Sequence, residues 1–323
     1  MVMLGEVRMI EIYTTIDDTL SKIDKYEDGS WIALTDPSAT ELLEVSEKFG
    51  IDIDDLRAPL DEEERSRIEA EEDYTLILVD IPSVEDTQGR DRYITITIAI
   101  IVTELNIITV CLEETPVLKS FKDGRVKDFY TYKKTRFILQ ILYRNAAVYL
   151  QYLRVIDRKS EEIESRLYES TKNTKNQELI AMLELEKSLV YFSTSLRSNE
   201  VVLEKLLRNK SIKQYPEDTD LLEDVIVENK QAIEMANIYT GILSSMTDSV
   251  ASIISNNLNV VMKLMTAITI VMAIPTMIAS FYGMNVGGIH PGLNNSYGFD
   301  IVIIGSVLVT GIVTAVLAKK GMF

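Results

Sequence analysis

Two long apolar runs near the C-terminus constrain this chain more than any other feature. The first follows Lys263 and continues for about 18 residues to Phe281, and the second covers residues 301–317. A helix needs roughly 17–25 residues to cross a bilayer, so both runs are long enough. We therefore expect two transmembrane spans, at about residues 262–282 and 301–318, with an outer loop at residues 283–300.

Most of the charge lies before these spans. The 323-residue chain has a formal net charge of −17, whereas residues 263–323 hold three lysines and one acid. Such an acidic surface repels nucleic acid, so we expect no nucleic-acid partner. With one histidine, His290, and one cysteine, Cys111, a protomer cannot build a His/Cys zinc site. The sequence shows neither a glycine-rich phosphate loop nor a Ser/His/Asp set, and we predict that the protein is no enzyme.

Residues 1–128 predict a cytosolic α/β domain. Alternating or β-branched runs indicate strands at residues 9–15, 31–34, 74–81, 93–102 and 107–112. Ser38 can cap a helix whose apolar residues recur at helical spacing and which ends at Gly50. A second short helix is expected at residues 52–60.

Residues 129–258 change to a helical pattern. Apolar residues recur every three or four positions on both sides of a break near residues 171–176, which predicts an antiparallel hairpin of two helices. A third helix follows Pro216 and shows no clear stop before Gly283. At 1.5 Å per residue this stalk helix would be about 90 Å long and would run directly into the first span of a transmembrane domain at residues 259–323. We expect it to act as a lever.

Small or polar residues recur along this third helix at an average step of 3.5 residues. That step is the seam period of supercoiled parallel helices. A water-filled lumen would explain a polar seam, and close packing of membrane helices through small residues would explain it equally well. If the seam lines a pore, its members near the membrane are Asn259, Met262, Thr266, Thr269, Ala273, Thr276 and Ser280.

The lysines predict how the chain is oriented. Lys263 precedes the first span, Lys319 and Lys320 follow the second, and residues 286–300 contain neither lysine nor arginine. By the positive-inside rule, both termini are cytoplasmic. We expect a multi-pass protein of the cell membrane with the lipid bilayer as one partner.

The first span ends in Tyr282-Gly283-Met284-Asn285, and with this motif in this position the chain resembles the CorA family of magnesium transporters. The order of parts agrees: an acidic α/β domain, a long stalk helix, two C-terminal spans and a tail with lysines. The resemblance implies a funnel-shaped homopentamer with a single pore lined by the first spans. It also implies Mg²⁺ influx, with Co²⁺ or Ni²⁺ accepted as well.

The resemblance implies a selectivity filter at Gly283, Met284 and Asn285. Magnesium holds its hydration waters tightly, so Asn285 carbonyls can accept hydrogen bonds from those waters instead of replacing them. Met262 is a candidate hydrophobic constriction that closes by dewetting, although ordinary helix packing also accounts for it.

The resemblance also implies that Mg²⁺ bound between neighbouring cytosolic domains holds the pore closed. Asp224 matches the family's carboxylate on the stalk helix, and its partner is Glu85 or Asp86, between which the sequence does not choose. Two carboxylates across an interface repel unless a cation lies between them, so losing the ion would separate the domains. Mg²⁺ would then be both substrate and regulatory ligand.

The loop at residues 286–292 is neutral where family loops are often acidic, which predicts weaker concentration of cations at the outer mouth.

Two alternatives to a magnesium transporter remain. A ZntB-like zinc or nickel transporter usually has isoleucine in place of Met284. A membrane-anchored cation sensor or scaffold would have no use for the polar seam.

Overall fold

The computed structural model describes residues 9–61, 64–86, 91–169, 172–208, 216–284 and 297–322. It divides into two units, Met1–Ser245 and Met246–Phe323. In chain order the elements are β1 (Ile10–Ile16), β2 (Thr19–Ile23), β3 (Trp31–Thr35), α1 (Ala39–Phe49), α2 (Ile53–Arg57), the 3-10 turn η1 (Ala58–Leu60), β4 (Arg67–Ala70), β5 (Tyr74–Asp86), β6 (Asp91–Thr103), β7 (Ile107–Cys111), α3 (Pro116–Lys122), α4 (Lys134–Glu169), α5 (Lys172–Arg208), α6 (Pro216–Tyr282) and α7 (Gly298–Lys319).

The first unit is built on one seven-stranded sheet with the strand order β2-β1-β3-β7-β6-β5-β4. Neighbouring strands are antiparallel except β3 and β7, which run parallel with Trp31 opposite Ile107. Helices cover both faces, and strands buried on both sides read as continuous apolar runs. This explains why residues 76–79 and 98–101 are uninterrupted apolar segments.

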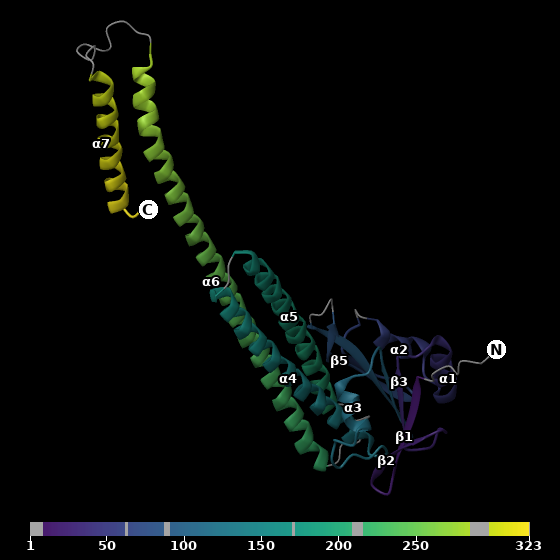
Figure 1. The fold of residues 1–323 in the computed structure, drawn as a ribbon. Coiled ribbons are helices and arrows are strands. Elements are labelled where there is room, and N and C mark those ends of the chain that lie inside the picture. Colours follow the sequence, from purple (N-terminus) through teal and green to yellow (C-terminus); the bar gives the residue numbers. More distant parts are fainter. Residues whose placement is uncertain are drawn as a thin grey trace, which may run out of the picture. The chain divides into compact units, whose positions relative to one another are not determined.

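Each face of the sheet has its own core. One face packs against α3, α4, α5 and α6, through Phe121, Phe137, Leu203 and Leu222 among others. The other packs against α1 and α2, through fully buried Val45 and Leu56 among others. Figure 1 shows α1 and α2 on the opposite side of the strands from α4 and α5. The first unit is therefore a three-layer α/β/α sandwich.

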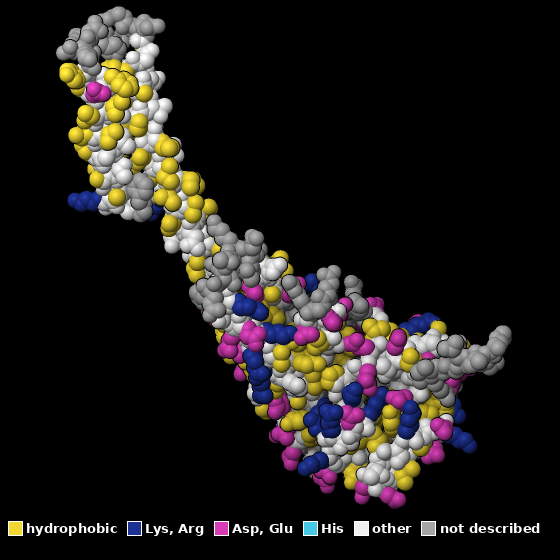
Figure 2. Space-filling model, viewed as in Figure 1, with side chains coloured by type: hydrophobic (Ala, Val, Ile, Leu, Met, Phe, Trp, Pro, Cys, Tyr) yellow, Lys and Arg dark blue, Asp and Glu magenta, His cyan; other side chains and the backbone are white. Residues whose placement is uncertain are grey.

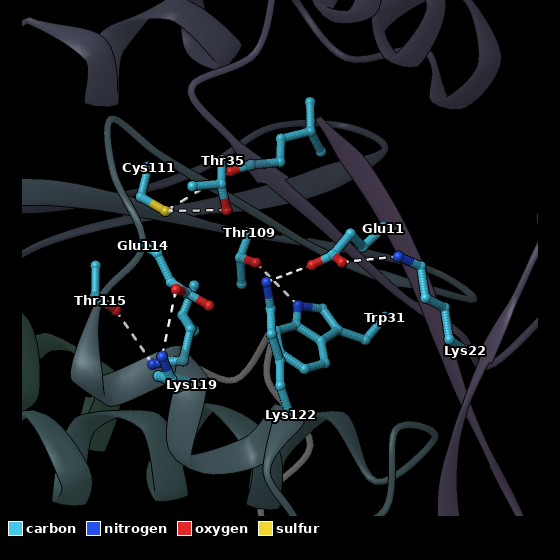
Figure 3. Close-up of polar contacts among 12 residues, drawn as sticks. Glu11, Lys22, Trp31, Thr35, Thr109, Cys111, Glu114, Thr115, Lys119 and Lys122 are labelled. Carbon is cyan, nitrogen blue, oxygen red and sulfur yellow. Dashed lines mark hydrogen bonds and ion pairs between the residues drawn. The ribbon is translucent and has the colours of Figure 1, made fainter. Parts of the chain in front are cut away.

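Trp31 lies at the middle of the first core. Its side chain is fully buried and stacks on Tyr13 with ring centroids 5.1 Å apart, while Phe121 and Phe137 meet its edge. The indole Nε1–H donates a hydrogen bond to Thr109 Oγ1 at 2.9 Å, as Figure 3 shows. That bond satisfies the polar atom of the ring and links β3 to β7.

A charged group ties the first strand to its surroundings. Glu11 on β1 accepts hydrogen bonds from Lys22 on β2, at 2.8 Å, and from Lys122 at the end of α3 (Figure 3). Burial by itself would raise the pKa of Glu11, but these two lysines outweigh it and lower the pKa to about 2. The carboxylate is thus held in its charged form.

Most of the predicted elements are present. The five predicted strands correspond to β1, β3, β5, β6 and β7, and the predicted helix after Ser38 is α1. Ser38 and Glu41 form a capping box, and Gly50 ends the helix in the left-handed conformation with φ of 67°. The prediction omitted β2, β4 and α3. It also ended β5 at residue 81 although this strand continues to Asp86, and it gave β6 as residues 93–102 although this strand is Asp91–Thr103.

The predicted hairpin is formed by α4 and α5, which are 36 and 37 residues long. Arg166 near the end of α4 pairs with Glu178 near the start of α5 at 3.2 Å. The predicted third helix is α6, which is 67 residues long and continues through Pro275. Side chains from α5 and the start of α6 belong to the same core as the sheet. The division at residues 128 and 258 stays a prediction.

The second unit consists of the later part of α6 and of α7. Within the described residues, two helices are long and apolar enough to cross a membrane, α6 and α7. Figure 2 shows hydrophobic side chains over these helices, whereas lysine, arginine and acidic side chains cover the first unit. The second predicted span lies within α7, which begins at Gly298.

Candidate ion pathway and regulatory site

Three threonine hydroxyls on α6 bond back to their own helix. Thr266 donates to the carbonyl of Met262 at 2.8 Å, and Thr269 and Thr276 donate in the same way to residues four positions earlier, at 2.8 and 3.0 Å. A hydroxyl has one proton, so this bond leaves only the oxygen lone pairs for other partners. The three side chains therefore present hydrogen-bond acceptors.

A groove of about 690 Å³ follows part of the predicted seam. It is lined by Thr269, Ala273, Thr276 and Ser280 together with apolar neighbours, which are Ile268, Met272, Met277 and Phe281 of the same helix and Met284 just after it. Asn259, Met262 and Thr266 lie outside this groove and have exposed side chains. A shared face fits a lumen and a packing surface alike, so pore lining stays a prediction.

The motif begins where α6 ends. The helix stops at Tyr282, and the Gly283 N–H donates to the carbonyls of Ala279 and Ser280 at 3.0 and 3.2 Å. A Cβ added at Gly283 would lie 3.4 Å from the Ala279 carbonyl oxygen, an ordinary contact. Backbone geometry within the described chain therefore tolerates a larger residue there. Met284 is half exposed, and Asn285 lies outside the described residues.

The predicted regulatory carboxylates lie on two elements of the first unit. Asp224 is on the exposed face of α6, while its neighbour Val225 is buried in the core. Glu85, near the end of β5, pairs with Arg92 at 3.7 Å, and Asp86 is opposite Asp91 in the register. Asp224, Glu85 and Asp86 stay predicted metal ligands.

Within one chain the described residues contain no group of three or more His, Cys, Asp or Glu side chains that could hold a metal ion. The sequence did not predict which bases pair with the acids of β5 and β6. Arg92 contacts Glu85, and Lys159 of α4 pairs with Asp91 at 2.8 Å. Only the strand register and the position of α4 reveal these pairs.

This architecture defines a class of protein: a membrane protein with an N-terminal α/β unit and two C-terminal membrane-spanning helices, the first of them the end of a helix that starts in the α/β unit. A family model described as CorA-like Mg²⁺ transporter protein matches residues 26–320. The chain belongs to this family of magnesium transporters. It is accordingly a transport protein and not an enzyme.

Known relatives agree with the assignment. The cobalt/magnesium transport protein CorA of Methanocaldococcus jannaschii is 29% identical over 300 residues, which are 90% of each chain. The complete structure of the CorA magnesium transporter from the same organism matches with a TM-score of 0.83 at 26% identity, covering 98% of this chain and 100% of that one. The predicted fold of the single chain, an N-terminal domain of strands and helices followed by a long helix and two C-terminal apolar spans, is confirmed.

A more distant likeness concerns the fold alone. The cytoplasmic domain of ZntB from Vibrio parahaemolyticus matches with a TM-score of 0.61 at 10% identity, covering 77% of this chain and 100% of that domain. An identity this low says nothing about which ion this chain carries.

Proposed function

We propose that this chain assembles into a funnel-shaped homopentamer with one central pore lined by α6, through which Mg²⁺ enters the cytosol. Co²⁺ is the second proposed substrate, because a relative at 29% identity is named a cobalt/magnesium transport protein. Ni²⁺ is a third. The observation that supports the pore is the set of acceptor oxygens along α6. Three threonine hydroxyls donate their hydrogens to carbonyls of their own helix, so only their oxygen lone pairs are left for other partners.

Acceptor oxygens suit this ion because Mg²⁺ gives up its hydration waters reluctantly. The outward-pointing hydrogens of those waters need acceptors, and neutral oxygens supply them without the strong binding that carboxylates would cause. We assign the pore lining to Asn259, Met262, Thr266, Thr269, Ala273, Thr276 and Ser280. Met262 is the proposed hydrophobic constriction, and Gly283, Met284 and Asn285 form the proposed filter.

Regulation is the second part of the proposal. A Mg²⁺ ion between Asp224 of one protomer and Glu85 or Asp86 of its neighbour would hold the closed state. The exposure of Asp224 on α6 supports this role, since the side chain is accessible to a second chain. Arg92 already pairs with Glu85, so an ion at Glu85 would have to displace that arginine.

The proposed orientation puts both termini in the cytoplasm and the loop at residues 283–300 outside the cell membrane. Lys263, Lys319 and Lys320 support it through the positive-inside rule. In functional terms the chain then has three parts: a cytosolic α/β domain at residues 1–128, a helical hairpin and stalk at residues 129–258, and a transmembrane domain at residues 259–323.

Threonine-to-valine variants test the pore. Valine keeps the shape of threonine and removes the acceptor oxygen, so we would change Thr266, Thr269 and Thr276 together. The matched control changes Thr310 and Thr314 of α7, whose hydroxyls bond back to carbonyls four residues earlier at 2.7 and 2.8 Å. Influx of Mg²⁺, Co²⁺, Ni²⁺ and Zn²⁺ into liposomes is measured side by side under a membrane voltage.

We expect the α6 variant to lose roughly 30- to 1000-fold of its Mg²⁺ flux, because three lost hydrogen bonds are worth about 2–4 kcal/mol at the barrier. The α7 variant should transport normally. Equal flux in both variants would contradict pore lining by α6. A preference of the unchanged protein for Zn²⁺ would favour the ZntB-like alternative, and absence of any divalent flux would favour the membrane-anchored sensor.

A further inference from the structure

Asp80 lies on β5 just past the point where the edge strand β4 stops. The pairing of β4 with β5 ends with Arg67 opposite Leu78, so no strand continues beside Asp80 on that edge. Two asparagine side chains take its place. Asn199 of α5 accepts from the Asp80 N–H at 2.9 Å, and Asn199 and Asn145 of α4 donate to the Asp80 carbonyl at 2.7 and 2.8 Å. The α4–α5 hairpin therefore docks on the sheet edge at this residue.

The protons of the nearby hydroxyls are mostly used elsewhere. Ser66 donates its proton to Asn199 Oδ1 at 3.0 Å, and Ser195 donates its proton to Thr95 Oγ1 at 3.2 Å. Thr97 donates to Asp80 Oδ1, but at the long distance of 3.4 Å. A carboxylate at this position would have to compete with Asn199 and Thr95 for the two serine protons, whereas a carboxylic acid could donate its own proton to one of the hydroxyl oxygens.

Charged groups do not compensate Asp80 within the described surroundings. From α4 it faces Tyr149, which is fully buried, and Asn145. From α5 it faces Ser195 and Asn199, and from β6 it faces Thr97. Arg67, at the end of β4 where the pairing with β5 stops, is engaged by Glu64 and Glu69.

Burial raises the pKa of Asp80, and the hydroxyls of Ser195, Ser66 and Thr97 offset only part of this effect. Burial raises the pKa of Tyr149 well above its ordinary value, so this phenol stays neutral and adds no charge beside Asp80. One buried acceptor on a side chain that bonds to the Asp80 backbone, Asn145 Oδ1, has no hydrogen-bond partner among the described residues. The pocket therefore favours a neutral acid over a carboxylate.

We propose that Asp80 is a proton-binding site: the folded unit holds it as a neutral carboxylic acid that donates to the Ser66 or Ser195 oxygen, and release of this proton to water as the pH rises weakens the docking of α4 and α5. The effect would extend to α6, because Asn229 of α6 donates to the carbonyl of Leu196, next to Ser195, at 3.1 Å. Influence on Asp224, five residues before Asn229, rests on the function proposed above.

The sign of the pH effect follows from linkage. Between the ordinary aspartate pKa of 3.8 and its raised value in the folded state, the folded protein keeps the proton and the unfolded chain loses it. Stability therefore falls as the pH rises through this window, and it becomes constant once Asp80 also ionises in the folded state.

Thermal unfolding of the full-length protein in detergent, between about pH 5 and pH 9, tests the proposal. Asp80→Asn keeps the size of the side chain and cannot ionise. Its melting temperature should exceed that of the unchanged protein by a margin that grows by about 3 °C per pH unit and then levels off. Asp24→Asn, at an exposed position just after β2, should show no pH-dependent margin. A constant margin, or an Asp80→Asn protein less stable at alkaline pH, would overturn the proposal.

Infrared spectroscopy of the unchanged protein gives a reading that does not depend on a variant's folding. The carbonyl stretch of a protonated carboxylic acid should be present at mildly acidic pH, above the ordinary aspartate pKa, and should vanish as the pH rises further. The Asp218→Asn protein, which lacks another acid whose pKa is raised by burial, should keep this band. Absence of the band throughout, or its loss in Asp218→Asn, would refute a proton on Asp80. Mg²⁺ flux is measured on the same preparation, so a failure of transport is distinguished from a failure of this proposal.

Discussion

Replacing Asn199 with alanine should weaken the docking of the α4–α5 hairpin on the sheet. The expected loss of stability is larger than the removal of one short side chain suggests. The side chain is 3% exposed and makes three hydrogen bonds, two with the backbone of Asp80 and one with the Ser66 hydroxyl. Alanine removes all three. The Asp80 carbonyl keeps its bond from Asn145, but the Asp80 N–H and the Ser66 hydroxyl lose their acceptors.

The magnitude follows from what replaces each bond. An orphaned buried N–H costs about 1–3 kcal/mol, and the bond lost at half-buried Ser66 about 1 kcal/mol, which gives about 2–4 kcal/mol in the free energy of unfolding. For a unit of this size, that corresponds to a melting temperature roughly 5–15 °C lower. Hydrogen exchange should also accelerate in α5 before it does in the central strands, because the hairpin opens first.

The matched control is Asn237→Ala, the same change at an exposed position of α6 where the side chain accepts from Ser193 at 3.2 Å. It should cost less than about 0.5 kcal/mol, as expected for an exposed substitution. Both variants are purified at full length and unfolded thermally in the same detergent. Equal shifts in melting temperature for the two would refute the reasoning that Asn199 replaces a missing strand.

Three further predictions concern charge and transport. Glu11→Gln should remove part of the acid sensitivity of unfolding between about pH 4.5 and pH 2, because a carboxylate with a pKa near 2 loses its stabilising effect as the pH falls through that window. Asp224→Lys should abolish the protection from protease that Mg²⁺ gives the first unit, whereas Glu223→Lys, with the same charge change one residue away, should retain it; equal protection in both would exclude Asp224 as the ligand. Asn285→Ala should abolish Mg²⁺-dependent growth of a transport-deficient cell at normal expression, and normal growth would exclude the filter role.

The elements that sequence patterns predicted are those with strong local signals. The serine and glycine at the ends of α1 and the β-branched runs of β5 and β6 are of this kind. Strand β4 is a short edge strand in a charged segment. Its Arg67 and Glu69 pair with each other. Its pattern is polar, so hydrophobic periodicity could not detect it. Helix α3 did have a local signal, since Thr115 caps it and Pro116 is its first residue.

The candidate sites divide in the same way. The polar seam depends on spacing along one helix, so it could be read from the sequence. The ion pair between Arg92 and Glu85 depends on the register of β5 and β6. The surroundings of Asp80 depend on Asn145 and Asn199, which are 65 and 119 residues away in the chain. Contacts at such separations are set by packing, which no local pattern encodes.

The parallel pairing of β3 with β7 has a consequence for synthesis. Trp31 is opposite Ile107, a separation of 76 residues along the chain (107 − 31). At about 5–20 residues per second, a ribosome needs roughly 4–15 s to make that stretch. Throughout this interval β3, whose Ile32 and Leu34 are fully buried in the finished protein, waits with one edge open. During this interval the open edge of β3 can pair with a strand of another chain, so the nascent protein can aggregate through its N-terminal strands before any membrane segment has been made.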